Sequence, residues 1–117
     1  METLFVEYPK CTTCKKAKKW LCENNIEFKE RHIVEDNPTK EELKKWIEIS
    51  GLPINKFFNT SGKLYREMNL KDKIKNCSEE ELIGILSTDG MLVKRPILVM
   101  ENKVLVGFKE EQYKEIV

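Results

Sequence analysis

The chain opens with a strand, loop and helix pattern that places a pair of cysteines at the start of a helix. Residues 3–6 form a short apolar run without polar alternation, which predicts a buried central strand. Tyr8-Pro9-Lys10 interrupts this run, and apolar residues at helical spacing then predict a helix over residues 12–23. The motif Cys11-Thr12-Thr13-Cys14 therefore lies where the strand passes into the helix.

A second strand and a helical middle section are predicted next. Residues 26–33 read as a strand, and the strand–helix–strand order predicts a right-handed crossover with parallel pairing. Two capping boxes predict helix starts: Thr39 with Glu42, and Ser78 with Glu81. A turn at residues 59–62 and a short helix over residues 64–69 are predicted between them.

The C-terminal part predicts a hairpin and a last helix. Residues 97–100 and 104–106 are apolar runs separated by Glu101-Asn102-Lys103, and residues 109–116 form the helix. The element order is that of an α/β thioredoxin-like fold, with the helical middle section inserted at one face or end of the sheet. The 117 residues are the size of one domain, and nothing in the sequence requires more than a monomer.

Composition excludes several classes of function. The net charge is +1, with 35% charged residues of both signs, which argues against direct binding of nucleic acid. No apolar run approaches the roughly 20 residues that span a bilayer, and the N-terminus is too short and acidic for a secretory signal. We therefore expect a cytoplasmic protein whose four cysteines serve catalysis, metal binding or burial rather than structural disulfides.

The cysteine pair is the candidate reactive centre. A thiol at a helix N-terminus lies near unpaired N–H groups, which favour its thiolate, and Lys10 and Lys15 add positive charge. Cys14, one helical turn further on, could attack a mixed disulfide formed at Cys11 and release the bound partner. Two alternatives remain: a pair of inert buried cysteines, or a zinc site that recruits Cys22, Cys77 or His32 at irregular spacings.

The other candidate residues receive ordinary structural interpretations. Cys22 is predicted to be buried on the same helix face as Cys14, and Cys77, before a predicted helix start, is predicted to be a bystander. His32 is read as a strand residue, while Trp20 and Trp46 lie in apolar stripes and are assigned to the core.

Lys94-Arg95-Pro96 directly precedes the apolar run of the hairpin. A proline is tolerated at a strand start, and a cis bond before it would hold a fixed geometry. The planar fork of Arg95 could reach an anion at Cys11 or the thiolate itself, although spacing alone favours a solvated Lys–Arg pair.

Several segments together resemble the arsenate-reductase-like family that includes ArsC and the redox regulator Spx, and within it the YusI-like branch. The resemblance extends over almost the whole chain. It is carried by residues 8–17, 57–62, 65–67, 89–97 and 106–108. It implies a thioredoxin-like fold with a helical insertion over about residues 38–92. It also implies that Cys11 is the nucleophile and that Arg95 precedes a cis-proline, Pro96, as a site residue.

The sequence departs from the arsenate reductases of this family at two arginine positions. These enzymes resemble each other in using three arginines, whereas here the first position falls at Asn59 and the third near Gly107. Each lost charge-assisted bond is worth roughly 1.5–3 kcal/mol, so arsenate should bind weakly. The presence of Cys14, as in Spx, further favours disulfide chemistry.

The leading hypothesis is a thiol–disulfide oxidoreductase without a bound cofactor. Cys11 would be the nucleophile and Cys14 the resolving thiol, with glutathione or another low-molecular-weight thiol as co-substrate, or thioredoxin or glutaredoxin as reducing partner. The first alternative is an Spx-like redox switch that binds the C-terminal domain of the RNA polymerase α subunit. The second is an arsenate reductase dependent on glutathione and glutaredoxin.

Overall fold

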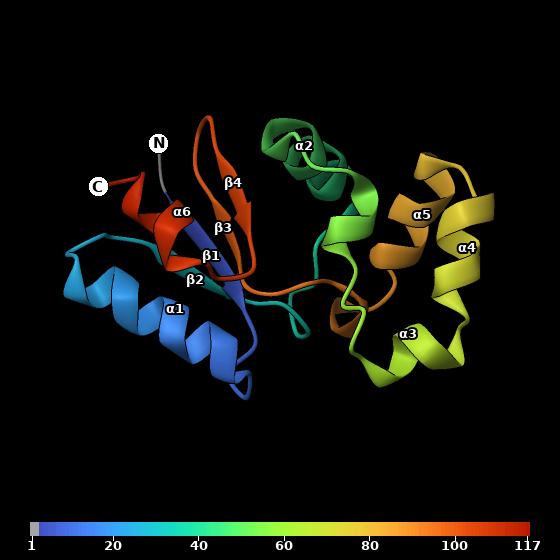
Figure 1. Cartoon of the computed structure of the whole chain (residues 1–117), viewed down its shortest axis with the longest axis horizontal. Helices are drawn as coiled ribbons and strands as arrows, with labels where there is room; N and C mark the ends of the chain where they lie inside the picture. The colour runs from blue at the N-terminus through green and yellow to red at the C-terminus, as the bar shows by residue number, and fades with distance from the viewer. Residues whose placement is uncertain (1–2) are drawn as a thin grey trace.

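The structure is a computed structural model that describes residues 3–117, and at its centre is one four-stranded sheet. The strands are β1 (Leu4–Glu7), β2 (Lys29–His32), β3 (Ile97–Val99) and β4 (Val104–Val106), in the order β2-β1-β3-β4. β1 pairs parallel with β2 and antiparallel with β3, and β3 pairs antiparallel with β4. The predicted central strand, parallel crossover and C-terminal hairpin are confirmed (Figure 1).

One face of the sheet is covered by α1 (Thr12–Glu23) and the short α6 (Glu110–Lys114), which lie together in Figure 1. Alternation along β1 turns Phe5 toward this face, where it joins a cluster with Leu21 and Tyr113. Trp20 meets Tyr113 edge to face, with ring centroids 5.5 Å apart. The cluster fixes α1, and hence the cysteine pair at its start, against the central strand.

The other face carries a larger core that includes most of the helical middle section. Its helices are α2 (Lys40–Ser50), η1 (Ile54–Phe57), α3 (Lys63–Glu67), α4 (Leu70–Asn76), α5 (Glu79–Leu86) and η2 (Gly90–Leu92). In Figure 1, α3, α4 and α5 gather at one end of the long axis, and α2 lies nearer the sheet. Trp46 of α2 and Phe57 of η1 are buried in the same core as Val6 of β1. The predicted α/β thioredoxin-like fold with a helical insertion is confirmed.

Local sequence signals account for several helix boundaries. Both capping boxes form, with Thr39 accepting from the Glu42 N–H and Ser78 from the Glu81 N–H. α2 ends at Gly51, whose φ of +70° lies in the left-handed region that favours glycine. Trp20 and Trp46 are buried as predicted.

Three predicted elements differ from those observed. The second strand begins at Lys29 rather than residue 26, because its pairing with β1 starts at Leu4 and it runs exposed along the sheet edge. The sequence analysis missed α4, which buries only Leu70 and so shows no apolar stripe. The last helix is shorter than predicted, ending at Lys114.

Cys22 is exposed, so the prediction that it is buried with Cys14 was wrong. Successive residues are turned about 100° around a helix, so Cys22 points well away from its buried neighbour Leu21. Its position near the end of α1 leaves it facing solvent.

Two contacts fasten the helical section to the strand side of the molecule. Gly90 lies against the backbone of Ile33, and a Cβ there would come within 1.9 Å of the Ile33 carbonyl oxygen. Only glycine permits this approach. The second contact is an ion pair that joins β2 to α2.

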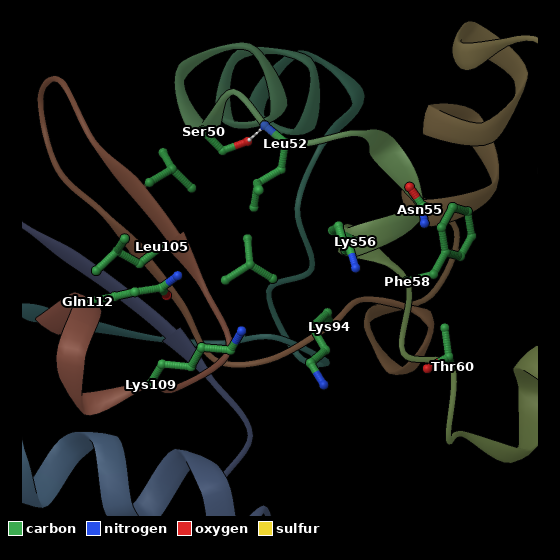
Figure 2. Close-up of a pocket in the computed structure, with 12 residues that line it drawn as sticks. Ser50, Leu52, Asn55, Lys56, Phe58, Thr60, Lys94, Leu105, Lys109 and Gln112 are labelled. Atoms are coloured by element: carbon green, nitrogen blue, oxygen red, sulfur yellow. Dashed lines mark hydrogen bonds between the residues drawn. The ribbon is translucent and has the colours of Figure 1, made fainter.

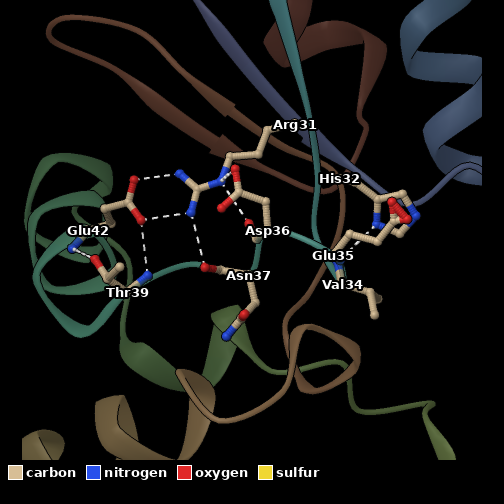
Figure 3. Close-up of polar contacts among 8 residues, drawn as sticks. All are labelled: Arg31, His32, Val34, Glu35, Asp36, Asn37, Thr39 and Glu42. Atoms are coloured by element: carbon tan, nitrogen blue, oxygen red, sulfur yellow. Dashed lines mark hydrogen bonds and ion pairs between the residues drawn. The ribbon is translucent and has the colours of Figure 1, made fainter.

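Arg31 of β2 forms this ion pair with Glu42 of α2 (Figure 3). Its Nη1 and Nη2 donate to the two carboxylate oxygens, the latter over 2.8 Å, while Nη2 and Nε also donate to the carbonyls of Asn37 and Asp36. The guanidinium lies 5.9 Å from the ring centroid of Trp46. Hydrogen bonds from Arg31 hold the pKa of Glu42 at about 2, although burial opposes this by raising it.

We expect Glu42→Gln to destabilise the fold at neutral pH by about 1–2 kcal/mol, allowing for solvent screening of this partly exposed pair. The Glu42 pKa is lowered by folding, so its contribution is present above the ordinary value of 4.5 and is lost as the pH falls toward about 2. Urea unfolding of both proteins at several pH values measures this difference.

Glu41→Gln is the matched control, since Glu41 is an exposed neighbour in the same helix turn. We expect it to cost less than about 0.5 kcal/mol at every pH. Equal losses from the two substitutions would contradict a specific role for the Arg31–Glu42 pair.

Candidate functional site

Cys11 is the N-cap residue of α1, and its sulfur occupies the position usually taken by a capping oxygen. Its backbone is extended, with φ −87° and ψ 121°, and its own N–H donates to the Tyr8 carbonyl over 2.9 Å. The Cys14 N–H donates to the Cys11 Sγ over 3.4 Å. The predicted placement of this thiol at a helix N-terminus is confirmed, and it leaves the sulfur beside N–H groups that stabilise negative charge.

Arg95 lies beside this sulfur rather than in bulk solvent. It precedes β3, and its bond to Pro96 is cis. The guanidinium carbon lies 5.0 Å from the ring centroid of Tyr8. The Nε and Nη1 atoms are buried without a hydrogen-bond partner among residues 3–117. Spacing alone favours two solvated side chains here. Lys94 is exposed as that interpretation predicts, whereas Arg95 is not.

The surroundings of Cys11 lower its pKa. Burial by itself raises this pKa, but hydrogen bonds from the Cys14 N–H, the Cys14 thiol and the Arg95 guanidinium outweigh it, with added attraction to the Arg95 charge. Lys10 and Lys15, predicted to supply the positive charge, are exposed to solvent. The electrostatic partner of the thiol comes instead from a residue more than 80 positions away in the chain.

Cys14 has the opposite character. Its side chain is fully buried, and burial raises the pKa of its thiol to about 12, with contributions from Cys11 and Glu7. Hydrogen bonding from the Tyr8 backbone lowers this pKa and so opposes the rise. Cys14 is therefore a protonated thiol that donates toward Cys11, so the two sulfurs differ strongly in their tendency to ionise.

Three residues near the site were missed as site residues by the sequence analysis. Tyr8 supplies a carbonyl, an N–H and a ring to the cysteine pair and Arg95. His32 meets Tyr8 edge to face at 5.7 Å, and its Nδ1 accepts from the N–H groups of two following residues. Glu7 is a buried carboxyl at the end of β1, and burial raises its pKa. The only sequence signal for Glu7 and Tyr8 was their closeness to the CxxC motif, and His32, in the next strand, had none.

The remaining candidates lie outside this arrangement. Cys77 is half-buried at the end of α4, and Asn59 hydrogen-bonds to the backbone of Leu92 and Met91. Gly107 has φ +79° and donates its N–H to the Pro96 carbonyl over 2.8 Å. Among residues 3–117 no group of three or more metal-ligating side chains comes together, and no helix there is long and apolar enough to cross a membrane.

Known proteins resemble this chain over most of its length. The ArsC family model matches residues 6–116. YusI from Bacillus subtilis is 56% identical over 115 residues, covering 98% of both chains. The global transcriptional regulator Spx from Staphylococcus haemolyticus is 32% identical over 112 residues, covering 96% of this chain and 83% of Spx. The crystal structure of an ArsC family related protein from Bacteroides fragilis has a TM-score of 0.97 and 59% identity, covering 100% of this chain and 98% of that one.

We expect Arg95→Gln to raise the pKa of Cys11 and slow its alkylation by iodoacetamide several-fold at pH 7, because the substitution removes both a hydrogen bond and a positive charge. The measurement is the alkylation rate of Cys11 against pH, read by peptide mass spectrometry so that the exposed Cys22 does not interfere.

Lys10→Gln is the control for loss of one positive charge near the thiol, and we expect it to leave the profile close to that of the native chain. If both substitutions shifted the profile equally, overall charge rather than the Arg95 contact would control the thiol.

Proposed function

Because the chain belongs to the ArsC family, we propose that it is a thiol–disulfide oxidoreductase in which Cys11 is the nucleophile and Cys14 the resolving thiol. The observation that carries this proposal is the contrast between the two cysteines. Cys11 has a lowered pKa at a helix N-terminus, and Cys14 is a buried, protonated thiol one turn further on. Such a pair suits attack on a disulfide followed by intramolecular release.

The proposed reaction has two exchange steps. The Cys11 thiolate attacks one sulfur of a substrate disulfide, forming a mixed disulfide and expelling the first substrate thiolate. Cys14 then loses its proton, attacks the Cys11 sulfur and expels the second thiolate, which takes up a proton. The substrate is reduced by two electrons, and the protein is left with a Cys11–Cys14 disulfide.

The cycle requires a reductant that returns the two electrons. A dithiol protein of the thioredoxin or glutaredoxin type, or two molecules of a low-molecular-weight thiol such as glutathione, would reopen the Cys11–Cys14 disulfide by the same exchange chemistry. These exchange reactions need no bound cofactor.

The high pKa of Cys14 explains the proposed order of attack. A buried thiol with a pKa of about 12 carries almost no thiolate at neutral pH, so a substrate meets the Cys11 thiolate first. Once Cys11 is in a mixed disulfide, its negative charge is gone. The repulsion that Cys11 exerts on a Cys14 thiolate is then removed, which favours the second step.

Arsenate chemistry is less well supported. Of the three arginines that the resemblance to arsenate reductases implies, this chain has only Arg95. The third position, near Gly107, has a backbone φ of +79° that disfavours a side chain. A doubly charged oxyanion would therefore meet one guanidinium and few other donors.

We expect reaction with dithiodipyridine to release two equivalents of thiopyridone from a Cys22→Ser/Cys77→Ser chain and to leave no adduct. The first equivalent comes from attack by Cys11 and the second from closure by Cys14. In the same background, Cys14→Ser should release one equivalent and retain a thiopyridyl adduct. Absorbance and intact mass spectrometry measure both products.

Cys11→Ser in that background is the control for the buried thiol. We expect it to react many times more slowly, because Cys14 is both inaccessible and protonated. A stable adduct on a chain that keeps both cysteines would mean that Cys14 does not resolve, and the proposed cycle would be rejected.

A redox-controlled regulator is the second candidate function, favoured by the 32% identity to Spx over 96% of this chain. In this proposal the same cysteine pair would switch binding to the C-terminal domain of the RNA polymerase α subunit. A pull-down with that domain, using chain reduced by dithiothreitol and chain oxidised by diamide, tests it. Retention in one redox state alone supports the switch, and no retention in either state rejects it.

A further inference from the structure

A cleft of about 460 Å³ lies between the edge of the sheet and the helical section (Figure 2). One wall is formed by β4 and residues at the start of α6. The other is formed by the end of α2, the η1 helix and the residues that follow it. The volume falls within the range of about 300–1,000 Å³ that is typical of small-molecule sites. It is separate from the cysteine pair, none of whose atoms line it.

Three lysines line this cleft and give it a positive charge. Lys56 belongs to η1, Lys94 lies in the segment before β3, and Lys109 directly precedes α6. The three lysines therefore reach the cleft from different parts of the fold (Figure 2). Among residues 3–117, no aspartate or glutamate lines the cleft. None of the three lysines forms a salt bridge with a carboxylate in residues 3–117.

This local charge is not a general property of the chain. The whole sequence is nearly balanced, with 21 lysines and arginines against 20 aspartates and glutamates. A cleft lined by three lysines therefore concentrates positive potential in one place. Such a cleft attracts and retains negatively charged ligands.

Neutral hydrogen-bonding groups and apolar side chains complete the lining. Asn55, Thr60 and Gln112 provide side-chain amides and a hydroxyl, while the exposed Leu52 and the half-buried Val106 provide apolar surface. β4 is an edge strand. Its backbone alternates, with Gly107 donating toward β3 and Leu105 facing Leu98, so the N–H of Val106 points outward from the sheet. The cleft thus combines charge, directional donors and an apolar surface, as ligand sites commonly do.

We propose that this cleft binds a small organic molecule that carries at least two anionic groups, either phosphates or carboxylates. Lysine ammonium groups are mobile point charges that bind either phosphates or carboxylates, whereas the guanidinium of an arginine has a fixed, forked geometry. Anionic groups would lie against the lysines, and the body of the molecule would contact Leu52 and Val106. The proposal is independent of the redox function proposed for the cysteine pair.

The test is a titration of ¹⁵N-labelled chain with pyrophosphate and, separately, with citrate, followed by two-dimensional NMR at low ionic strength. We expect saturable shifts concentrated at residues 50–60, 94 and 104–112. Binding of pyrophosphate alone assigns the site to phosphates, binding of citrate alone assigns it to carboxylates, and each result supports the proposal. An absence of saturable shifts with both probes would overturn it.

Lys94→Gln/Lys109→Gln should weaken binding at least about tenfold, because the double substitution removes two charge-assisted contacts to the ligand. Lys71→Gln/Lys75→Gln removes the same charge from α4, whose residues do not line the cleft, and should leave the affinity unchanged. Equal weakening by both pairs would show unspecific attraction and reject the site. Matching NMR spectra of the free variants establish that both pairs fold.

Discussion

The packing of α1 against the central strand β1 decides where the Cys11 sulfur lies and which groups surround it. Phe5 and Leu21 bury this contact, so the strand end and the helix start are held together with only a short loop between them. The loop places the Tyr8 carbonyl against the Cys11 N–H and the Cys14 N–H against the Cys11 sulfur. A capping group normally satisfies a helix end. Here the capping group is also the candidate nucleophile, so local stability and reactivity depend on the same atoms.

The helical middle section serves the site from a distance. It leaves the sheet side after β2, where the Arg31–Glu42 pair and the Gly90 contact fasten it, and it returns the chain at Arg95. The segment that leads back to the sheet is fixed by a hydrogen bond in which the Lys94 N–H donates to the Phe57 carbonyl over 2.7 Å. One side of this returning segment presents a guanidinium to Cys11, and Lys94 lines the cationic cleft. The short segment that leads into β3 therefore contributes one residue to the cysteine site and one to the cationic cleft.

The two cysteines illustrate how burial and hydrogen bonding divide a single motif into two roles. Cys11 is half-buried, and donors that favour its thiolate outweigh the cost of burial. Cys14 lies one turn inward, where burial dominates and keeps the thiol protonated. The two thiols differ in burial because Cys11 precedes the first turn of α1, whereas Cys14 lies within that turn on the side of the helix that packs against the sheet. Equal exposure of both sulfurs would remove the order of reaction that we propose.

The sequence by itself determined the features that depend on nearest neighbours along the chain. These are the CxxC motif at a helix start, the two capping boxes, the hairpin and the buried tryptophans, because periodicity and capping are local. It did not reveal α4, which lacks an apolar stripe, or the exposure of Cys22, which depends on how α1 is rotated against its neighbours. Only the tertiary structure placed Arg95 against Cys11 and brought three distant lysines to one cleft. Charges far apart in sequence interact through space, and their distances are set by packing rather than by spacing.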